Sequence, residues 1–378
     1  MILNIASALL LAVLLLRFVL PLRCAGIKGR AALAALILAA CAKYQIYSWS
    51  SGTLFLPELP VPVVVGFEFL YVYAVVLALA LVIRDLLLIA LKILRLAKLN
   101  VRLPGTADAQ RLVLAAACGF LSAYGVYEAV RLPSVNEVDV RYANLPSDLD
   151  GYRIVQMSDL HAGPLHKRAW VSDVVGIANS LKPDLVAITG DFIDGSVAQS
   201  GDSMLPLASL KSRDGVFGVT GNHEYYYGMR QWTEHLEKQG VRMLFNEHRD
   251  VRRGSAVLEV GGIPDPAAGR MGGELPEPSE VFAGGVNGAF RLMLSHEPAF
   301  FIAEGNDADL QLSGHTHGGM MPILRQVVAG ANAGFVRGLY GRGSRYLYVG
   351  DGTGIWNGFS CRILTPPEIT VLTLRKAG

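Results

Sequence analysis

The sequence predicts an α/β domain preceded by four transmembrane helices. Residues 1–131 contain four apolar runs, each long enough as a helix to cross about 30 Å of hydrocarbon. From residue 152 onward, short apolar runs alternate with stretches in which apolar residues recur every three or four positions. That alternation is typical of βαβ units and predicts a largely parallel sheet.

Composition and charge divide the chain in the same way. Of the 378 residues, 52% are hydrophobic and only 17% are charged, below the roughly 25% of soluble domains. Residues 1–131 have a net charge of +7, whereas the remaining residues have −5 and all eight histidines. A basic, apolar part and an acidic, histidine-rich part indicate a membrane anchor joined to an exposed catalytic domain. The acidic balance argues against nucleic acid as a partner, and the composition excludes a disordered chain.

The four apolar runs cover approximately residues 2–20, 31–49, 63–83 and 112–130. The first run is not expected to be a cleaved signal peptide, because no basic residue precedes it and the first one is Arg17. Lys43 lies inside the second run, and its ammonium group is expected to extend to the membrane surface. Tyr44, Tyr47 and Trp49 predict an aromatic belt at the outer end of this helix.

The distribution of Lys and Arg in the loops predicts the orientation. The first loop carries Arg23, Lys28 and Arg30, whereas residues 50–62 contain no Lys or Arg. The third loop is again basic, with Arg84, Lys92, Arg95, Lys98, Arg102 and Arg111. The first and third loops are therefore expected in the cytoplasm. The N-terminus from Met1, residues 50–62 and everything after the fourth run, up to Gly378, are expected on the outer side.

Residues 86–99 place Lys92, Arg95 and Lys98 on one side of a leucine-rich helix. One alternative is an interfacial helix that lies on anionic lipid, and the other is a continuation of the third helix into the cytosol. Cations at steps of three residues fit both alternatives.

The region after residue 132 is expected to contain strands at 152–157, 185–189, 216–220, 291–295 and 310–313. Helices are expected at 168–181, 204–210 and 230–239, the first because apolar residues recur from Trp170 to Leu181 at helical spacing. After Gly334 only strands are expected, including 345–349 and 369–374. The Gly- and Pro-rich residues 262–280 are expected to form a loop.

A polar motif directly follows each of the first five predicted strands. The motifs are Asp159-Leu160-His161, Gly190-Asp191-Phe192-Ile193-Asp194, Gly221-Asn222-His223-Glu224, Ser295-His296 and Gly314-His315-Thr316-His317. Asp159 and Asp191 are 32 residues apart, and Asp191 and Asn222 are 31 apart, which matches one βαβ unit per step. Because the carboxyl ends of parallel strands open into one crevice, these side chains are expected to converge.

The converging groups are two carboxylates, one amide and several imidazoles. Mixed oxygen and nitrogen ligands suit Mn²⁺, Fe or Zn²⁺, whereas Ca²⁺ takes oxygen ligands. About seven ligands exceed the needs of one ion, and two ions that share a bridging carboxylate would use all of them. Paired metals ~3.5–4 Å apart are a device for the hydrolysis of phosphate esters. The sequence therefore predicts a dinuclear metal site.

The five motifs resemble the calcineurin-like metallophosphoesterase superfamily, because D-x-H, G-D-x-x-D, G-N-H-E, a lone His and G-H-x-H occur in that family's order. The resemblance covers about residues 150–378. The helical leader and the closing segment around Gly354, Arg362 and Pro367-Glu368 resemble the membrane-tethered bacterial branch. The resemblance implies an α/β/β/α sandwich with the dinuclear metal site at the carboxyl ends of the strands.

The resemblance also implies a role for each motif residue. One metal ion takes Asp159, His161 and His317, the second takes Asn222, His296 and His315, and Asp191 bridges them. His223 matches the family's catalytic histidine that is not a ligand, and Asp194 matches the carboxylate that orients it. Two divalent ions, whether Mn, Zn or Fe, would activate a bridging hydroxide, and His223 would protonate the leaving group.

The implied function is hydrolysis of phosphate mono- or diesters, and the membrane anchor favours an envelope or lipid-linked substrate. One alternative is a pyrophosphatase similar to the UDP-diacylglucosamine hydrolases, whose cytosolic substrate conflicts with the predicted orientation. An alternative of another class is a non-catalytic membrane scaffold that retains the fold. The intact set of ligand residues argues against the scaffold.

The expected domains are a four-helix transmembrane domain at 1–131, a linker with a leading strand at 132–150 and a catalytic domain at 151–378. The protein is expected to be a multi-pass protein of the bacterial inner membrane, with the catalytic domain on the periplasmic or extracellular side. Its expected partners are the phosphoester substrate and membrane lipids.

Overall fold

The computed structural model describes residues 2–96, 98 and 103–377, and the chain separates into two units. The first unit extends to Tyr127 and also includes Asn357–Cys361. The second unit contains Glu128–Trp356 and the chain from Arg362 onward. The expectations for Met1, Leu99, Arg102 and Gly378 concern residues that lie outside this description.

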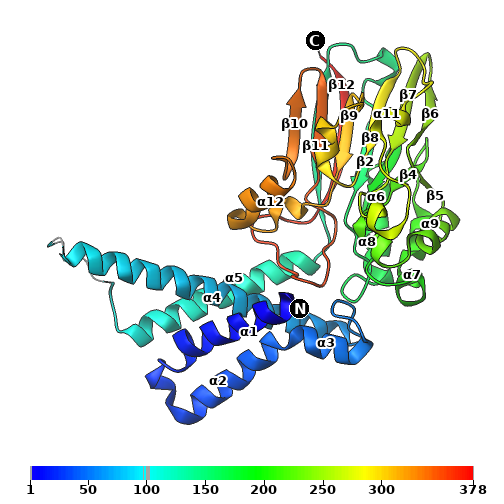
Figure 1. Ribbon diagram of the computed structural model, residues 1–378. Helices are drawn as coiled ribbons and strands as arrows, with labels where there is room; N and C mark the ends of the chain where they lie inside the picture. Colours follow the sequence, from blue (N-terminus) through cyan, green and yellow to red (C-terminus); the bar gives the residue numbers. More distant parts are fainter. Residues whose placement is uncertain (1, 97, 99–102, 378) are drawn as a thin grey trace. The chain divides into compact units, whose positions relative to one another are not determined.

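The first unit is helical (Figure 1). Its elements are α1 (Ile2–Leu14), a π-helical turn (Leu15–Val19), a 3-10 turn (Arg23–Ala25), α2 (Gly26–Cys41), α3 (Lys43–Ser51) and α4 (Val61–Leu96). The last is α5 (Ala107–Val130), whose final residues belong to the second unit. The side chains of Leu14, Leu77 and Leu81 are fully buried where α1 and α4 pack together.

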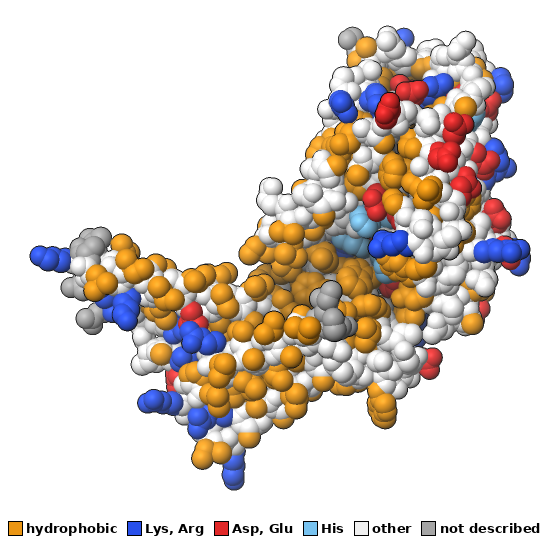
Figure 2. Space-filling model, viewed as in Figure 1, with side chains coloured by type: hydrophobic (Ala, Val, Ile, Leu, Met, Phe, Trp, Pro, Cys, Tyr) orange, Lys and Arg blue, Asp and Glu red, His pale blue; other side chains and the backbone are white. Residues whose placement is uncertain are grey.

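Three helical segments of the described chain are long and apolar enough to cross a membrane: Arg23–Cys41, Val61–Leu96 and Ala107–Val130. The first predicted run instead forms a shorter apolar helix, Leu3–Val19. Large hydrophobic side chains such as Leu16, Ile89 and Phe120 are exposed. Figure 2 shows hydrophobic side chains over much of the visible face of the helices. Apolar surface of this extent is typical of a unit whose surroundings are lipid.

The helix α4 is continuous through Lys92 and Arg95 to Leu96. Its 36 residues correspond to about 54 Å, which exceeds the roughly 30 Å of a hydrocarbon core. Of the two alternatives for residues 86–99, the described part therefore continues the third helix.

The predictions for Lys43 and for the aromatic belt are wrong. The second apolar run is interrupted at Ala42, where α2 ends and α3 begins. Lys43 is fully buried and paired with Glu68 of α4, so its ammonium group does not extend to a surface. Tyr44 and Tyr47 are buried beside this pair, and only Trp49 is exposed. The sequence signal was misleading because the partner carboxylate, Glu68, is 25 residues away.

The second unit contains two six-stranded sheets. The first consists, in spatial order, of β1 (Ser134–Tyr142), β12 (Glu368–Lys376), β2 (Arg153–Met157), β3 (Leu185–Thr189), β4 (Val216–Val219) and β5 (Val241–Met243). The strands from β2 to β5 are parallel, and β12 is antiparallel to β2. The parallel sheet expected at the start of the α/β domain is confirmed.

The second sheet consists of β10 (Gly338–Arg342), β11 (Arg345–Val349), β9 (Leu310–Ser313), β8 (Phe290–Leu294), β7 (Ala256–Gly262) and β6 (Glu247–Arg253). Its four middle strands are parallel, and both edge strands are antiparallel to their neighbours. The expected strands at 291–295, 310–313 and 345–349 are therefore present, the first shifted by one residue.

The two sheets pack face to face around one hydrophobic core (Figure 1). Along β2, Ile154 faces this core together with Leu292 of the second sheet, whereas Val155 faces the helices on the other side. The helices α6 (Arg168–Ser180) and α9 (Met229–Lys238) cover that outer face and contribute Val174 and Trp232. Strand β3 and, after Arg153, strand β2 are thus buried on both faces, which is why they read as nearly continuous apolar runs.

Shorter helices complete the unit. They are α7 (Val197–Met204), α8 (Asn222–Tyr226), α10 (Ala268–Met271), α11 (Pro278–Val281) and α12 (Arg325–Ala331). The helix expected at 204–210 is instead α7 followed by a 3-10 turn, Leu205–Ser209, because Pro206 cannot donate a backbone hydrogen bond. The loop expected at 262–280 contains α10 and the start of α11.

Candidate metal centre

Asp159 and His161 follow directly on the carboxyl end of β2, and both are fully or almost fully buried. Their backbones have positive φ values of 53° and 45°. The neighbouring loop holds them in this conformation, because Asp159 N–H donates to Gly190 O at 3.0 Å and His161 N–H donates to Asp191 O at 3.1 Å. The first motif is therefore fixed by the second one.

Asp191 and Asp194 follow β3, and both carboxylates are buried. Gly190 precedes them with a φ of 85°, and a Cβ atom there would lie 2.6 Å from Gly221 N and 2.7 Å from His296 Nδ1. Only glycine leaves room for this approach of three strand-end loops. Burial alone raises the pKa of Asp191, but the nearby His296 and His223 outweigh it and lower the pKa well below its usual range.

The third motif begins α8 after strand β4, and Glu224 organises it. The Glu224 carboxylate accepts three backbone N–H bonds, from Gly221 at 2.7 Å, Phe192 at 2.8 Å and Asp191 at 3.0 Å. Glu224 thus joins two strand-end loops without being part of any candidate ligand cluster among the described residues. His223 N–H donates to Asp191 Oδ1 at 2.9 Å, which adds a further link.

The second sheet supplies the remaining imidazoles. His296 follows β8, and its Nδ1 lies 2.7 Å from Thr189 O, so this nitrogen is the N–H donor and Nε2 is left for a ligand. His315 and His317 follow β9 with positive φ values of 70° and 47°. His315 N–H donates to both oxygens of Asp159 at 3.2 Å, so the two sheets are joined at the site.

The expected ligand atoms lie close together. His317 Nε2 is 3.5 Å and His161 Nε2 is 4.0 Å from Asp159 Oδ1. Asp191 Oδ2 lies 3.6 Å from His161 Nε2 and 3.3 Å from His296 Nε2, and His296 Nε2 is 3.2 Å from His315 Nδ1. Asp191 is therefore within reach of both groups of ligands. Ligands about 2.1 Å from a common ion stand roughly 3–4 Å apart, depending on the angle at the ion, so these spacings fit metal coordination.

Among the buried atoms that lack a hydrogen-bond partner in the described chain, two belong to expected ligands and fit the same interpretation. They are His161 Nε2 and Asn222 Oδ1. Buried polar atoms without partners are rare in folded proteins, and an ion is one of the usual reasons. Five of the seven expected ligands are buried and two, Asn222 and His315, are partly buried. Their mixture of oxygen and nitrogen atoms fits Mn²⁺, Fe or Zn²⁺.

His223 and Asp194 form a pair beside these ligands. His223 Nδ1 is 2.6 Å from Asp194 Oδ1, and the same oxygen is 3.2 Å from His161 Nδ1. Burial alone lowers the pKa of His223, but Asp191 and Asp194 outweigh it and raise the pKa to about 9. The contact between Asp194 and His161 was not predicted, because spacing in the sequence does not show that one carboxylate serves two imidazoles.

Sequence reasoning missed two residues of the site. Arg362 is fully buried, and its Nη2 lies 3.2 Å from His317 Nδ1. Trp356 has its ring centre 6.5 Å from that of His223, and Tyr226 and Tyr227 have theirs at 5.6 and 6.0 Å. In the sequence, Arg362 was noted only as part of the closing segment that resembles the family branch and received no role, and for Trp356 the Gly-rich stretch after β11 was the available signal. Figure 2 shows several histidine side chains close together on the visible face of the second unit.

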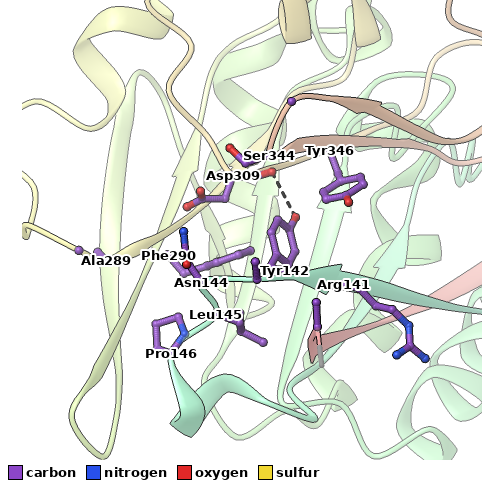
Figure 3. Close-up of a pocket in the computed structure, with 14 residues that line it drawn as sticks. Arg141, Tyr142, Asn144, Leu145, Pro146, Ala289, Phe290, Asp309, Ser344 and Tyr346 are labelled. Carbon is purple, nitrogen blue, oxygen red and sulfur yellow. Dashed lines mark hydrogen bonds between the residues drawn. The ribbon is translucent and has the colours of Figure 1, made fainter.

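A separate pocket lies at the opposite edge of the second sheet (Figure 3). It is lined by Tyr142, Phe290, Asp309 and Tyr346, which lie at the amino ends of β8, β9 and β11 or at the end of β1. Tyr142 donates a hydrogen bond to Asp309 O across it. None of the expected ligands lies in this pocket.

The His223–Asp194 pair predicts how the stability of the metal-free protein depends on pH. The pKa of His223 rises from 6.5 in the unfolded chain to about 9 in the folded chain. The ion pair therefore stabilises the folded state fully below pH 6.5, and this stabilisation is lost as the pH rises through about 9. In a chelator, the melting temperature of the wild type should exceed that of His223→Gln by more at about pH 6 than at about pH 10. Differential scanning fluorimetry in detergent measures the melting temperatures of the wild type and of His223→Gln at each pH. A difference that is unchanged or larger at high pH would contradict the ion pair.

Comparison with known proteins identifies the family. Residues 152–319 match the family model of the calcineurin-like phosphoesterases. An uncharacterized metallophosphoesterase of Campylobacter jejuni is 32% identical, and the match covers 68% of this chain and 67% of the relative. An uncharacterized metallophosphoesterase of Aquifex aeolicus is 30% identical, and the match covers 68% of this chain and 97% of the relative. A zebrafish transmembrane protein with a metallophosphoesterase domain is 34% identical over 68% of this chain. This chain spans only 61% of the length of that relative. The chain belongs to the calcineurin-like metallophosphoesterase family.

Proposed function

We propose that this protein hydrolyses phosphate mono- or diesters with two divalent metal ions. The proposal depends mainly on one observation: the ligand atoms of six expected residues form a buried cluster in which neighbours are 3.2–4.0 Å apart. The seventh expected ligand, Asn222, has its buried side-chain oxygen without a partner. A non-catalytic scaffold would not require seven potential metal ligands to lie this close together.

The roles assigned to the residues follow from this cluster. One ion would be held by Asp159, His161 and His317, the other by Asn222, His296 and His315, with Asp191 shared between them. Asp191 Oδ2 lies close to both His161 Nε2 and His296 Nε2, which supports Asp191 as a ligand shared by the two ions. When bound, such a pair of ions lowers the pKa of a shared water and offsets charge on the phosphoryl oxygens.

His223 is assigned as the general acid that delivers a proton to the leaving oxygen. Its Nδ1 is engaged by Asp194, so Nε2 is the nitrogen that can carry a proton toward substrate. In the metal-free protein Asp191 and Asp194 raise the pKa of His223 to about 9, and Asp194, which is not an expected ligand, is the carboxylate that would support a protonated ring when Asp191 holds metal. The exposed Tyr226 beside His223 would contact the leaving group.

The membrane unit supports a substrate that is lipid-linked or part of the cell envelope. We propose four spans, with α1 as the fourth beside the three longer apolar segments. In this arrangement residues 1–131 form the membrane domain, 132–150 the linker and leading strand, and 151–378 the catalytic domain. The catalytic domain would lie on the outer side of a bacterial inner membrane, since the basic loops mark the cytoplasmic side.

The acid role predicts a specific kinetic pattern for His223→Ala in the full-length protein. The variant should keep both metal ions, because it removes no ligand atom, and its kcat should fall roughly 10²–10⁴-fold on alkyl phosphates. The loss should be much smaller on p-nitrophenyl phosphate, whose leaving group departs without a proton. Metal content is measured by mass spectrometry and rates with both substrates. Asp194→Asn serves as a comparison and should show a milder loss with the same selectivity, because it only misorients the imidazole.

Loss of metal from His223→Ala would make His223 a ligand. An equal loss with good and poor leaving groups would make it a phosphate-binding group. Either result would exclude the role of His223 as general acid. Neither would exclude a metal-dependent hydrolase, which the metal content tests separately.

The proposed orientation is tested by labelling engineered cysteines in intact cells. In a chain freed of its four native cysteines, Ser51→Cys at the end of α3 should react with a membrane-impermeant maleimide without permeabilisation of the inner membrane. Lys28→Cys, at the exposed start of α2 where the first group of basic residues lies, is the matched control and should react only after permeabilisation. The opposite pattern would place the catalytic domain in the cytosol and favour a nucleotide-linked substrate.

A further inference from the structure

The first unit contains a fully buried ion pair. Lys43 Nζ of α3 lies 2.7 and 2.8 Å from the two carboxylate oxygens of Glu68 on α4, and neither side chain is exposed. Tyr47 donates a hydrogen bond to Glu68 Oε1 at 3.1 Å. Removing two charges from water costs several kcal/mol per ion, so packing alone does not explain this pair. Ionisable residues among apolar helices usually have a functional partner.

The partner is a segment of chain that is 292–315 residues away in the sequence. Lys43 Nζ also donates to Asn357 O at 3.2 Å and to Gly358 O at 3.1 Å, so its three protons serve the carboxylate and two carbonyls. Tyr44 donates to Gly358 O at 2.7 Å. Ser360 N–H in turn donates to Glu68 Oε2 at 3.2 Å.

An irregular segment needs such partners when it packs among apolar helices. Its backbone groups form no helix or sheet ladder, and each unpaired group in an apolar setting costs several kcal/mol. A lysine offers three donors to the carbonyls and a glutamate offers an acceptor to the N–H group. The ring of Phe359 packs edge-on against Tyr71 of α4, with 6.4 Å between ring centres. Lys43, Tyr44, Glu68 and Tyr71 thus form a binding site, which we term the socket, for Asn357–Cys361.

The two residues that flank this segment belong to the second unit and contact the metal centre. Trp356, on one side, has its ring 6.5 Å from that of His223. Arg362, on the other side, lies 3.2 Å from His317 Nδ1 and donates to Asp351 O at 2.7 Å. Only five residues separate Trp356 from Arg362, so the path of the segment restricts where both can lie.

We propose that the socket binds Asn357–Cys361 and that Lys43 and Glu68 are positioning residues, which hold Trp356 and Arg362 beside the histidines of the metal centre. Catalysis in this protein then requires the helices for more than anchoring. The predicted effect on kcat rests on the proposed phosphoesterase function, whereas the binding of Asn357–Cys361 by the socket does not.

The test uses Cys361, which lies at the end of the segment and is fully buried. Burial raises the pKa of its thiol to about 12, so it should react slowly with a maleimide while the segment is bound. The background chain carries Cys24→Ser, Cys41→Ala and Cys118→Ala, and is studied at full length in detergent. The test variant is Lys43→Met with Glu68→Met, because replacing both partners of a buried pair by apolar residues preserves folding where a single replacement does not.

The double variant should keep its melting temperature and metal content, label at Cys361 about tenfold faster or more, and lose about 10–100-fold in kcat. Asp85→Asn is the matched control, since it removes a carboxylate paired with Arg17 and Arg84 and should change neither labelling nor kcat. Should the double variant fail to fold, Tyr44→Phe removes one donor to Gly358 O and should give a smaller increase in labelling.

A folded double variant with a protected Cys361 would refute the socket, as would Tyr44→Phe with unchanged labelling. Fast labelling with unchanged kcat would refute the positioning role. If the wild type hydrolyses no phosphoester, the proposed function fails, and the labelling result alone still decides whether the socket binds the segment.

Discussion

The candidate metal centre depends on backbone conformations that its residues do not adopt readily by themselves. Five of the seven expected ligands have positive φ values: Asp159, His161, Asp191, His315 and His317. A non-glycine residue in this region costs of order 1–3 kcal/mol and persists only when its surroundings hold it there. Hydrogen bonds between the strand-end loops supply that support, such as those from Asp159 N–H to Gly190 O and from Gly314 N–H to His296 O. The site is therefore a property of the loops as a set, and no single motif forms it alone.

The two sheets provide the rigid frame for these loops. Gln156 on β2 donates to Thr189 Oγ1 on β3 at 3.0 Å and to Ser313 O on β9 at 2.9 Å, which ties both sheets together just before the ligands. Glu224 then fixes two loops through three backbone N–H groups. Because the expected ligands come from both sheets, any change in how the sheets pack would separate His315 and His317 from Asp159. This explains why a hydrolytic site occupies the edge of a closely packed two-sheet core.

Much of this arrangement could be predicted from local sequence, and the remainder depends on contacts between distant residues. Strands such as β3 were evident because both of their faces are buried and every residue is apolar or small. Strand β6 was missed because its sequence is charged and only Val251 is buried, so it resembles a loop. The convergence of the motifs followed from the parallel order of their strands. The burial of Lys43 could not be foreseen, since its partners are Glu68 and the carbonyls of Asn357 and Gly358. Arg362 was missed for the same reason.

The central claim is that Asp191 is shared by two metal ions, and metal stoichiometry tests it most directly. Full-length wild type, loaded with Mn²⁺ or Zn²⁺ and freed of excess metal, should contain about two ions per chain by mass spectrometry. Asp191→Asn should weaken both sites together, because it removes the carboxylate between His161 and His296. Asp309→Asn, a carboxylate change at the opposite edge of the second sheet, should leave both ions in place. Loss of a single ion from Asp191→Asn, with the other bound at its normal affinity, would contradict the shared site.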